Sequence, residues 1–329
     1  MYQQPFHSQD LRPFTFLVTG GAGFIGSHLV EYLLQHGAGR VRVLDNLATG
    51  FTKNLGLFRS DPRLEVREGD IREGCDCRQA CRGVDFVLHQ AALGSVPRSV
   101  EDPVTTNAVN VDGFLNVLVA AKENSVRRLV YAASSSTYGD SQNLPKVEDE
   151  IGRPLSPYAV TKLVNELYAD VFARTYGLET IGLRYFNVFG PRQDPQGAYA
   201  AVIPLLMKAL LDHQSPTIYG DGEQTRDFTF VANVVQDNVK ALFADDRAVN
   251  QVYNVAAGDR TSLNQLFTLL QQLAASELTA TYAPNRPGDI RDSLASVEKA
   301  RIRFGYDPQV RLREGLKITW EWFKQEFGK

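Results

Sequence analysis

The feature that most constrains this chain is a glycine-rich turn between an apolar strand and a helix. The apolar run from Phe14 to Thr19 predicts a buried strand and leads directly into Gly20-Gly21-Ala22-Gly23-Phe24-Ile25-Gly26. Helical periodicity then runs from Phe24 to His36 and ends at Gly37. Glycines in such a turn let backbone amides approach a pyrophosphate at the positive end of the helix. The three parts in this order predict a dinucleotide-binding unit.

Strands and helices alternate through the first half of the chain. This alternation favours a parallel sheet with helices on both faces. The predicted fold class is therefore α/β, with a Rossmann-type, doubly wound parallel sheet. Further strands are expected at Val41–Leu44, Leu64–Val66, Val84–Leu88, Leu129–Ala133 and Thr180–Leu183.

Two acidic positions follow predicted strands and bear on the choice of dinucleotide. Asp45 ends the second strand, 19 residues after Gly26, where a carboxylate can accept both hydroxyls of an adenosine ribose. The same carboxylate would repel a 2′-phosphate, which favours NAD over NADP, although an aspartate that only begins a turn before Asn46 fits the pattern too. Asp70 and Ile71, after the third strand, could hold the adenine or simply form a turn.

The sequence pattern changes after about residue 188, where prolines recur and the predicted strands become short and irregular. We expect an NAD-binding Rossmann domain over 1–187 and a smaller mixed α/β substrate-binding domain over 188–329. The stretch 228–258 is expected to return to the first domain. Residues 1–12 are polar and aperiodic and predict an arm.

Composition argues against several classes of protein. A net charge of −3 gives no general attraction for nucleic acid or an anionic membrane. No apolar run approaches the ~18 residues of a membrane span, and no secretory leader pattern opens the chain. Cys75, Cys77 and Cys81 are too few for a disulfide framework, and no histidine lies near them, so we expect helix-packing residues and no metal. A cytoplasmic location is expected.

A tyrosine and a lysine lie one turn apart on a predicted helix. Tyr158 and Lys162 form the pattern Y-x-x-x-K, with Ser156 as the expected helix cap, Pro157 as the first helical residue and the end at Gly177. The pair lies opposite an apolar stripe that we expect to pack against a neighbouring element or subunit. The stripe comprises Val160, Leu163, Val164, Leu167, Tyr168, Val171 and Phe172.

The tyrosine–lysine pair and a run of serines suggest proton transfer. A nearby ammonium stabilises a phenolate and lowers the pKa of the tyrosine, which can then remove a hydroxyl proton as a hydride leaves the same carbon. Ser134 ends a predicted strand, at the sheet edge where ligands of parallel sheets bind, and its hydroxyl could bond the reacting oxygen. An exposed Tyr and Lys, and serines that only satisfy a tight loop, are the alternatives for each motif alone.

These motifs together make the chain resemble the extended short-chain dehydrogenase/reductase family, and within it the UDP-sugar 4-epimerases. The resemblance runs over nearly the whole chain. It implies that Ser134 and Tyr158 are catalytic, that Ser135 assists, and that Lys162 binds the nicotinamide ribose and tunes Tyr158. It also implies a homodimer, through helices 107–123 and 157–176.

The resemblance extends to further cofactor contacts. His89-Gln90-Ala91-Ala92 is similar to a cofactor-lining segment after the fourth strand, and Asn107 and Asn110 are similar to residues of the helix that supports it. The full set of expected cofactor contacts is Gly20, Gly23, Phe24, Ile25, Gly26, Asp45, Asn46, Asp70, Ile71, Gln90, Ala91, Ala92, Asn107, Tyr158, Lys162 and Tyr185.

Substrate contacts are implied in the second half of the chain. Asn187 resembles an asparagine that contacts the UDP diphosphate, and Arg226 and Arg286 resemble the diphosphate clamp, for which bidentate guanidinium groups are well suited. Ser293 resembles a pocket position that is a bulky tyrosine in epimerases restricted to unacetylated sugars, so a 2-acetamido group would fit; a plain loop serine is the alternative. The other expected contacts are Ser95, Ser134, Val202 and Asp289.

The resemblance implies that the chain is a UDP-N-acetylglucosamine/UDP-N-acetylgalactosamine 4-epimerase. It would oxidise C4 transiently with bound NAD, let the keto sugar rotate, and return the hydride, with Ser134 bridging the proton transfer. A UDP-glucose/galactose or UDP-hexuronic acid 4-epimerase remains an alternative, as does a catalytically silent NAD-binding regulator. The related dehydratases carry an acidic residue where Ser135 and Ser136 lie, so that activity is disfavoured.

Overall fold

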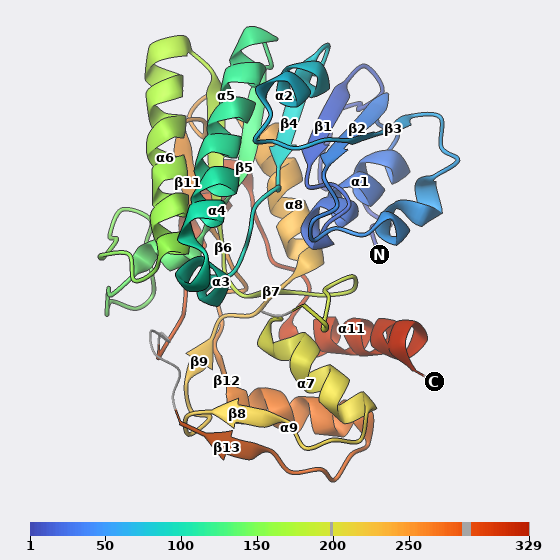
Figure 1. Ribbon diagram of the computed structural model, residues 1–329, viewed down its shortest axis with the longest axis vertical. Helices are drawn as coiled ribbons and strands as arrows, with labels where there is room; N and C mark the ends of the chain where they lie inside the picture. The colour runs from blue at the N-terminus through green and yellow to red at the C-terminus, as the bar shows by residue number, and fades with distance from the viewer. Residues whose placement is uncertain (198–199, 285–290, 329) are drawn as a thin grey trace.

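A seven-stranded parallel sheet forms the centre of the molecule (Figure 1). The computed structural model describes residues 1–197, 200–284 and 291–328. The strand order is β11-β6-β5-β4-β1-β2-β3, and each neighbouring pair is parallel. This order confirms the Rossmann-type α/β prediction. The strands are β1 (Thr15–Thr19), β2 (Arg40–Asp45), β3 (Leu64–Glu68), β4 (Phe86–His89), β5 (Arg128–Ser134), β6 (Glu179–Tyr185) and β11 (Gln251–Val255).

Helices cover both faces of this sheet. Figure 1 shows α5 and α6 on one side and α1 and α8 on the other. Residues alternate between the two faces of each strand, so Phe16 and Val18 of β1 enter one core cluster and Leu17 enters the other. The helices of this part are α1 (Phe24–Gln35), α2 (Gly74–Cys81), α3 (Val96–Glu101), α4 (Pro103–Asn107), α5 (Gly113–Glu123), α6 (Pro157–Tyr176) and α8 (Val231–Leu242), with shorter helical turns at Thr52–Phe58, Ala108–Asp112 and Ser135–Tyr138.

A smaller group of helices and short strands lies beyond the carboxyl ends of the sheet strands (Figure 1). The strand pairs are β7–β10, β8–β13 and β9–β12, and α7, α9 and α11 pack against one another. We propose that this group is the substrate-binding domain. Its elements, with the remaining helix and strands, are β7 (Val188–Phe189), α7 (Val202–Leu211), β8 (Thr217–Tyr219), β9 (Thr225–Arg226), β10 (Thr229–Phe230), β12 (Thr261–Ser262), α9 (Leu263–Ala274), β13 (Thr281–Ala283), α10 (Glu298–Phe304) and α11 (Leu312–Phe327).

Helix α6 begins and ends where the sequence predicts. The Ser156 side chain accepts a hydrogen bond from the Ala159 amide, Pro157 is the first helical residue, and Gly177 ends the helix at a φ of +70°. Much of its apolar stripe faces away from the chain's own core, because Val160, Leu167 and Val171 are 49%, 59% and 45% exposed, whereas Phe172 is buried in the core. The face toward the sheet instead carries small and polar side chains, Lys162 among them.

The first twelve residues are held firmly against α1, which a polar arm would not explain. Tyr2 and Leu11 are buried, and the Phe6 ring stacks on Tyr32 with centroids 5.2 Å apart. The Phe6 amide also donates to the Tyr32 hydroxyl at 2.7 Å. The prediction of an arm missed this packing because three widely spaced apolar residues give no periodic signal.

Candidate active site

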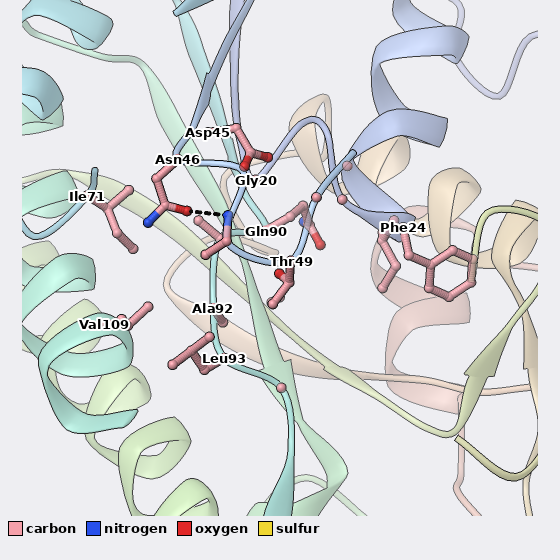
Figure 2. Close-up of a pocket in the computed structure, with 18 of the residues that line it drawn as sticks. Gly20, Phe24, Asp45, Asn46, Thr49, Ile71, Gln90, Ala92, Leu93 and Val109 are labelled. Carbon is pink, nitrogen blue, oxygen red and sulfur yellow. Dashed lines mark hydrogen bonds between the residues drawn. The ribbon is translucent and has the colours of Figure 1, made fainter. Parts of the chain in front are cut away.

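The largest set of predicted site residues lies around one cavity at the carboxyl ends of the sheet strands. The cavity encloses about 370 Å³, and Figure 2 shows Asp45, Gln90 and Phe24 among its walls. Strand ends and the glycine turn meet here because all sheet strands run in one direction. The predicted residues that line it are Gly20, Gly23, Phe24, Ile25, Gly26, Asp45, Asn46, Asp70, Ile71, Gln90, Ala91, Ala92, Ser134, Tyr158, Lys162 and Tyr185.

The glycine turn leaves no room for side chains. A Cβ atom on Gly26 would lie 2.1 Å from the carbonyl oxygen of Gly20, and one on Gly20 would lie 2.7 Å from the amide nitrogen of Ala91. Gly20 also has a φ of +67°, which favours glycine. The turn therefore brings bare backbone to the start of α1, where the helix dipole favours a pyrophosphate. These residues fit a dinucleotide.

The acidic residue at the end of β2 is held by backbone amides. Asp45 accepts from the Ala22 amide at 2.9 Å and from the Leu47 amide at 2.8 Å. The first bond ties the carboxylate to the glycine turn, and the second fixes the loop that follows the strand. A carboxylate has two acceptor sites on each oxygen, so sites remain for ribose hydroxyls in the cavity.

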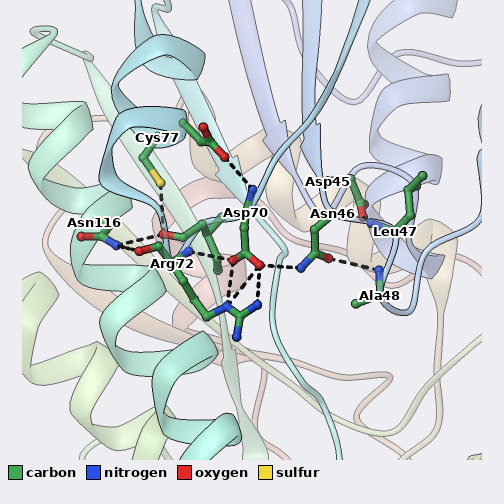
Figure 3. A network of polar contacts seen from close by, with 10 residues as sticks. Asp45, Asn46, Leu47, Ala48, Asp70, Arg72, Cys77 and Asn116 are labelled. Carbon is green, nitrogen blue, oxygen red and sulfur yellow. Dashed lines mark hydrogen bonds and ion pairs between the residues drawn. The ribbon is translucent and has the colours of Figure 1, made fainter.

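A chain of polar contacts extends from Asn46 to the neighbouring wall of the cavity (Figure 3). The Asn46 amide group donates to Asp70 at 2.9 Å, and the Arg72 guanidinium binds both oxygens of Asp70. The Arg72 contacts hold the pKa of Asp70 at about 2, so this carboxylate is charged at neutral pH. The network fixes Asp70 before any ligand binds.

The predicted cysteine cluster serves packing at this wall. The Cys77 thiol donates to the Ile71 carbonyl at 3.3 Å, and Asn116 donates to the same carbonyl at 3.0 Å. Burial raises the pKa of Cys77 and Cys81 to about 12, which keeps both thiols protonated.

Among the described residues, no group of His, Cys, Asp and Glu is arranged to hold a metal. No helix in the same part of the chain is long and apolar enough to cross a membrane.

Lys162 is a buried residue that also lines this cavity. Its ammonium donates to the Ala132 carbonyl on β5 at 2.7 Å, and the residue is 2% exposed. Burial lowers the pKa of Lys162 to about 8, and Glu166 one turn later acts in the opposite direction. An ammonium donates three hydrogen bonds, so two remain for ligand groups.

Tyr158 and Ser134 meet beside Lys162. The Lys162 nitrogen lies 5.9 Å from the centre of the Tyr158 ring. Burial raises the pKa of Tyr158, and a hydrogen bond with Ser134 acts to lower it. The Ser134 hydroxyl also accepts hydrogen bonds from Ser136, because the short helical turn brings residue 136 back over the end of β5. Ser135 is the first residue of that turn.

Side chains from two more elements complete the walls near Tyr185. The Tyr185 hydroxyl bonds Gln90 at 3.1 Å and Asn238 of α8 at 2.8 Å, and Gln90 also donates to Asn238. The sequence reasoning missed Asn238, since only the fold brings α8 to the end of β6. Asn110 binds the amide and carbonyl of Leu93 and contacts Thr161 beside Lys162, as a supporting residue should.

Asn107 does not reach this cavity. It is exposed at the end of α4, whereas Val109, two residues later, lines the cavity wall. Two residues correspond to about 200° of rotation on a helix, so both side chains cannot face the same side. The structure therefore does not support the expected contact from Asn107.

A second cavity of about 450 Å³ contains three of the predicted substrate contacts. Asn187, Val202 and Arg226 line it, and Tyr185 of the first cavity lies only two residues before Asn187. Tyr219 of β8, Gln224 of a loop and Leu263 at the start of α9 also line it. They were not predicted, because none of them belongs to a motif. Arg286 and Asp289 lie outside the described residues.

Ser293 lies on a segment that is bound to β9. The Ser293 amide donates to the Thr225 carbonyl at 3.2 Å, directly before Arg226. The carboxylate of Asp227 binds the amides of Ala295 and Ala257, which fixes the same segment from the other side. Asp227 was another residue that the sequence reasoning missed. Ser95 caps α3 by accepting from the Arg98 amide at 3.2 Å, close to the cavity residue Gly94.

Comparison with known proteins agrees with this geometry. A curated relative, a putative UDP-glucose 4-epimerase of Methanocaldococcus jannaschii, is 39% identical over 94% of this chain and 98% of its own. The UDP-N-acetylglucosamine 4-epimerase of Methanobrevibacter ruminantium, solved with UDP-N-acetylmuramic acid, is 39% identical with a TM-score of 0.91 over 95% of this chain and 99% of its own.

A third relative was solved with the dinucleotide. The UDP-glucose 4-epimerase of Thermus thermophilus in complex with NAD is 36% identical, with a TM-score of 0.86 over 95% of this chain and 99% of its own. The model of the NAD-dependent epimerase/dehydratase family matches residues 16–256, which include the glycine turn, Ser134, Tyr158 and Lys162. This chain belongs to the NAD-dependent epimerase/dehydratase family.

Proposed function

We propose that this enzyme interconverts UDP-N-acetylglucosamine and UDP-N-acetylgalactosamine by epimerisation at C4, with NAD as a resident cofactor. The observation that carries the proposal is that Tyr185 lines the first cavity and Asn187, two residues later in the chain, lines the second. Tyr158, Ser134 and Lys162 lie in the first cavity, and Arg226 with Asn187 lines the second. A nucleotide held in the second cavity would present its sugar to the three catalytic groups.

The residues of the first cavity fit NAD. The bare glycine turn would receive the pyrophosphate, Asp45 the adenosine ribose, and Asp70 with Ile71 the adenine. The bound nicotinamide supplies reversible acceptance of a hydride from C4 of the sugar. Lys162 would bind the nicotinamide ribose with the hydrogens that Ala132 leaves available.

The chain's own residues would handle the proton and the diphosphate. Tyr158 takes the proton of the 4-hydroxyl, and the ammonium of Lys162 stabilises the phenolate. Ser134 donates a hydrogen bond near the same oxygen. Arg226 suits a diphosphate because a guanidinium binds two phosphate oxygens at once, and Asn187 lies beside it in the cavity.

The acetylated sugar is proposed from the size of residue 293. Serine occupies a position next to the Thr225–Arg226 strand, although it is not among the residues that line the two cavities. A small side chain at this position would leave volume for a 2-acetamido group. The similarity to the UDP-N-acetylglucosamine 4-epimerase of Methanobrevibacter ruminantium points the same way. A UDP-glucose or UDP-hexuronic acid substrate is the alternative, and a silent regulator is disfavoured because Tyr158, Lys162 and Ser134 are all present.

Enlarging residue 293 should separate the two sugar classes. In Ser293→Tyr, kcat/KM for UDP-N-acetylglucosamine is expected to fall about a hundredfold, because the larger side chain would fill the space of the acetamido group. Turnover of UDP-glucose, which has no acetamido group, should change less than about threefold. Ser293→Ala is the control, since it keeps the volume and should keep both activities. Equal loss of both activities in Ser293→Tyr would refute the assignment of this residue to the acetamido pocket.

We also propose that a second copy of the chain covers the outer face of α3, α4 and α6. Large apolar side chains are exposed there, with Val100, Val104 and Leu167 at 66%, 78% and 59%. Helix α6 contacts both α3 and α4, so these residues belong to one surface. Light scattering should give a mass of twice 36.6 kDa, and a stable monomer would contradict the proposal.

A further inference from the structure

Ser134 has an unusual hydrogen-bond environment for a residue expected to pass a proton. Its Oγ accepts two hydrogen bonds from one neighbour, from the Ser136 amide at 3.1 Å and from the Ser136 hydroxyl at 2.8 Å. A hydroxyl oxygen has two acceptor sites and carries one hydrogen. Both acceptor sites of Ser134 are therefore filled by Ser136, and its single hydrogen is left for donation into the cavity.

We infer that Ser136 is a positioning residue that makes Ser134 a pure hydrogen-bond donor, whose single hydrogen points toward the Tyr158 oxygen. The inference rests on the proposed roles of Ser134 and Tyr158. A Ser134 whose acceptor sites are filled cannot receive the proton of the 4-hydroxyl. That proton then passes directly from the sugar oxygen to the Tyr158 oxygen, as the C4–H bond releases its hydride. Ser134 only donates, and it does not bridge the transfer as the family resemblance led us to expect.

The ionisable groups around Tyr158 are consistent with this arrangement. Lys162 on α6 is the cation that approaches its ring, and Ser134 at the end of β5 is the donor that lowers its pKa. Lys162 in turn faces Glu166 on the same helix and His89 on β4, where burial lowers the His89 pKa to about 3 and keeps that ring neutral. Among these groups around Tyr158, Ser136 can influence only the hydrogen bond from Ser134, because it contacts the Ser134 hydroxyl directly.

The neighbouring hydroxyl of Thr137 offers a matched comparison. Thr137 is fully buried in the same helical turn, and its hydroxyl donates to the Ser134 carbonyl at 2.8 Å, not to the Ser134 hydroxyl. Thr137→Val thus removes one hydroxyl from the turn and keeps the side-chain shape. It tests whether any lost hydrogen bond in the turn is enough to impair the reaction.

The experiment measures kcat, KM and their pH dependence for Ser136→Ala, Ser136→Thr and Thr137→Val, with bound NAD and thermal unfolding checked for each. In Ser136→Ala, kcat should fall about tenfold with KM within about twofold. The acid limb of the kcat/KM profile should move upward by roughly half a pH unit, because a phenolate that loses an oriented donor has a higher pKa.

Two further variants distinguish a positioning role of Ser136 from a purely structural one. Ser136→Thr keeps a hydroxyl and should recover to within about threefold, and Thr137→Val should leave the pH profile in place. The inference is overturned if Ser136→Ala keeps the wild-type pH profile, or if Ser135→Ala moves that profile while Ser136→Ala does not. Full activity in Tyr158→Phe would instead refute the proposed catalytic roles, so the two failures are distinguishable.

Discussion

Tyr158→Phe should reduce kcat by about a thousandfold while NAD and UDP remain bound. The substitution removes only the phenolic oxygen, which is the proposed acceptor of the 4-hydroxyl proton. Positioned general bases contribute on the order of a hundredfold to ten-thousandfold in rate. The proposed cofactor contacts of the glycine turn, Asp45 and Lys162 do not involve this oxygen. Timed assays of epimer formation measure kcat, and the amount of bound NAD is measured after the protein is denatured.

A second tyrosine on the same helix provides the control. Tyr176 is 53% exposed at the far end of α6, and its phenylalanine variant should keep kcat within about twofold of the wild type. If Tyr158→Phe turned over at more than a tenth of the wild-type rate, another group would have to accept the proton. If it lost NAD together with activity, the loss would report on binding instead of proton transfer.

Arg184→Met should lower the free energy of unfolding by about 3–5 kcal/mol, the cost of breaking a buried ion pair by removing one partner. Arg184 on β6 binds both carboxylate oxygens of Glu166 on α6, at 2.9 and 2.7 Å. The two side chains are 4% and 8% exposed, so water cannot take over the charge that remains. The guanidinium also donates to the Glu148 carbonyl and stacks on the Tyr138 ring at 4.8 Å.

Urea unfolding at neutral pH measures this change in the free energy of unfolding. Two further variants show whether the change comes from an unpaired buried charge. Glu166→Gln combined with Arg184→Met removes both charges and should recover part of the loss, because no buried charge is left alone. Arg174→Met breaks the exposed pair with Asp170, 70% and 53% exposed, and should change the free energy by under about 0.5 kcal/mol. An Arg184→Met change as small as that of Arg174→Met would show that the buried pair is not needed for stability.

The sequence was most informative where chemistry is local. The glycine turn, the cap at Ser156 and the Y-x-x-x-K spacing each depend on residues within one or two turns of one another, and the structure places them as predicted. Six of the seven sheet strands were found within a few residues of their ends, because buried parallel strands are short apolar runs between turns. The seventh, β11, was not predicted as a strand, although it lies in the stretch 228–258 that was expected to return to the first domain. Neighbouring elements decide the exact ends.

The residues that were missed act across the fold. Asn238 and Asp227 have no motif of their own, and each acquires its role from a partner that tertiary structure brings to it. Asp227 and Ala295 are 68 residues apart, so no local pattern could pair them. Ser136 differs, since its partner is two residues away; the short helical turn at the end of β5 was the missing information.

Two predictions show what remains open once a helix has been placed correctly. Asn107 was placed on the right stretch of chain, but the angle of its turn directs it to solvent, and Val109 lines the cavity instead. The apolar stripe of α6 was correctly read as a face, yet this chain leaves much of it exposed. Periodicity gives the face of a helix, and only the packed structure shows what covers it.

The most direct test of the account is the fate of the hydrogen at C4. Purified protein is incubated in ordinary water, without added NAD, with UDP-N-acetylglucosamine that carries deuterium at C4, and the products are followed by NMR. The account predicts that UDP-N-acetylgalactosamine accumulates to an equilibrium mixture and keeps deuterium at C4, because the hydride removed by the resident cofactor returns to the same carbon. Product with protium from water at C4, or no conversion even after NAD is supplied, would contradict it.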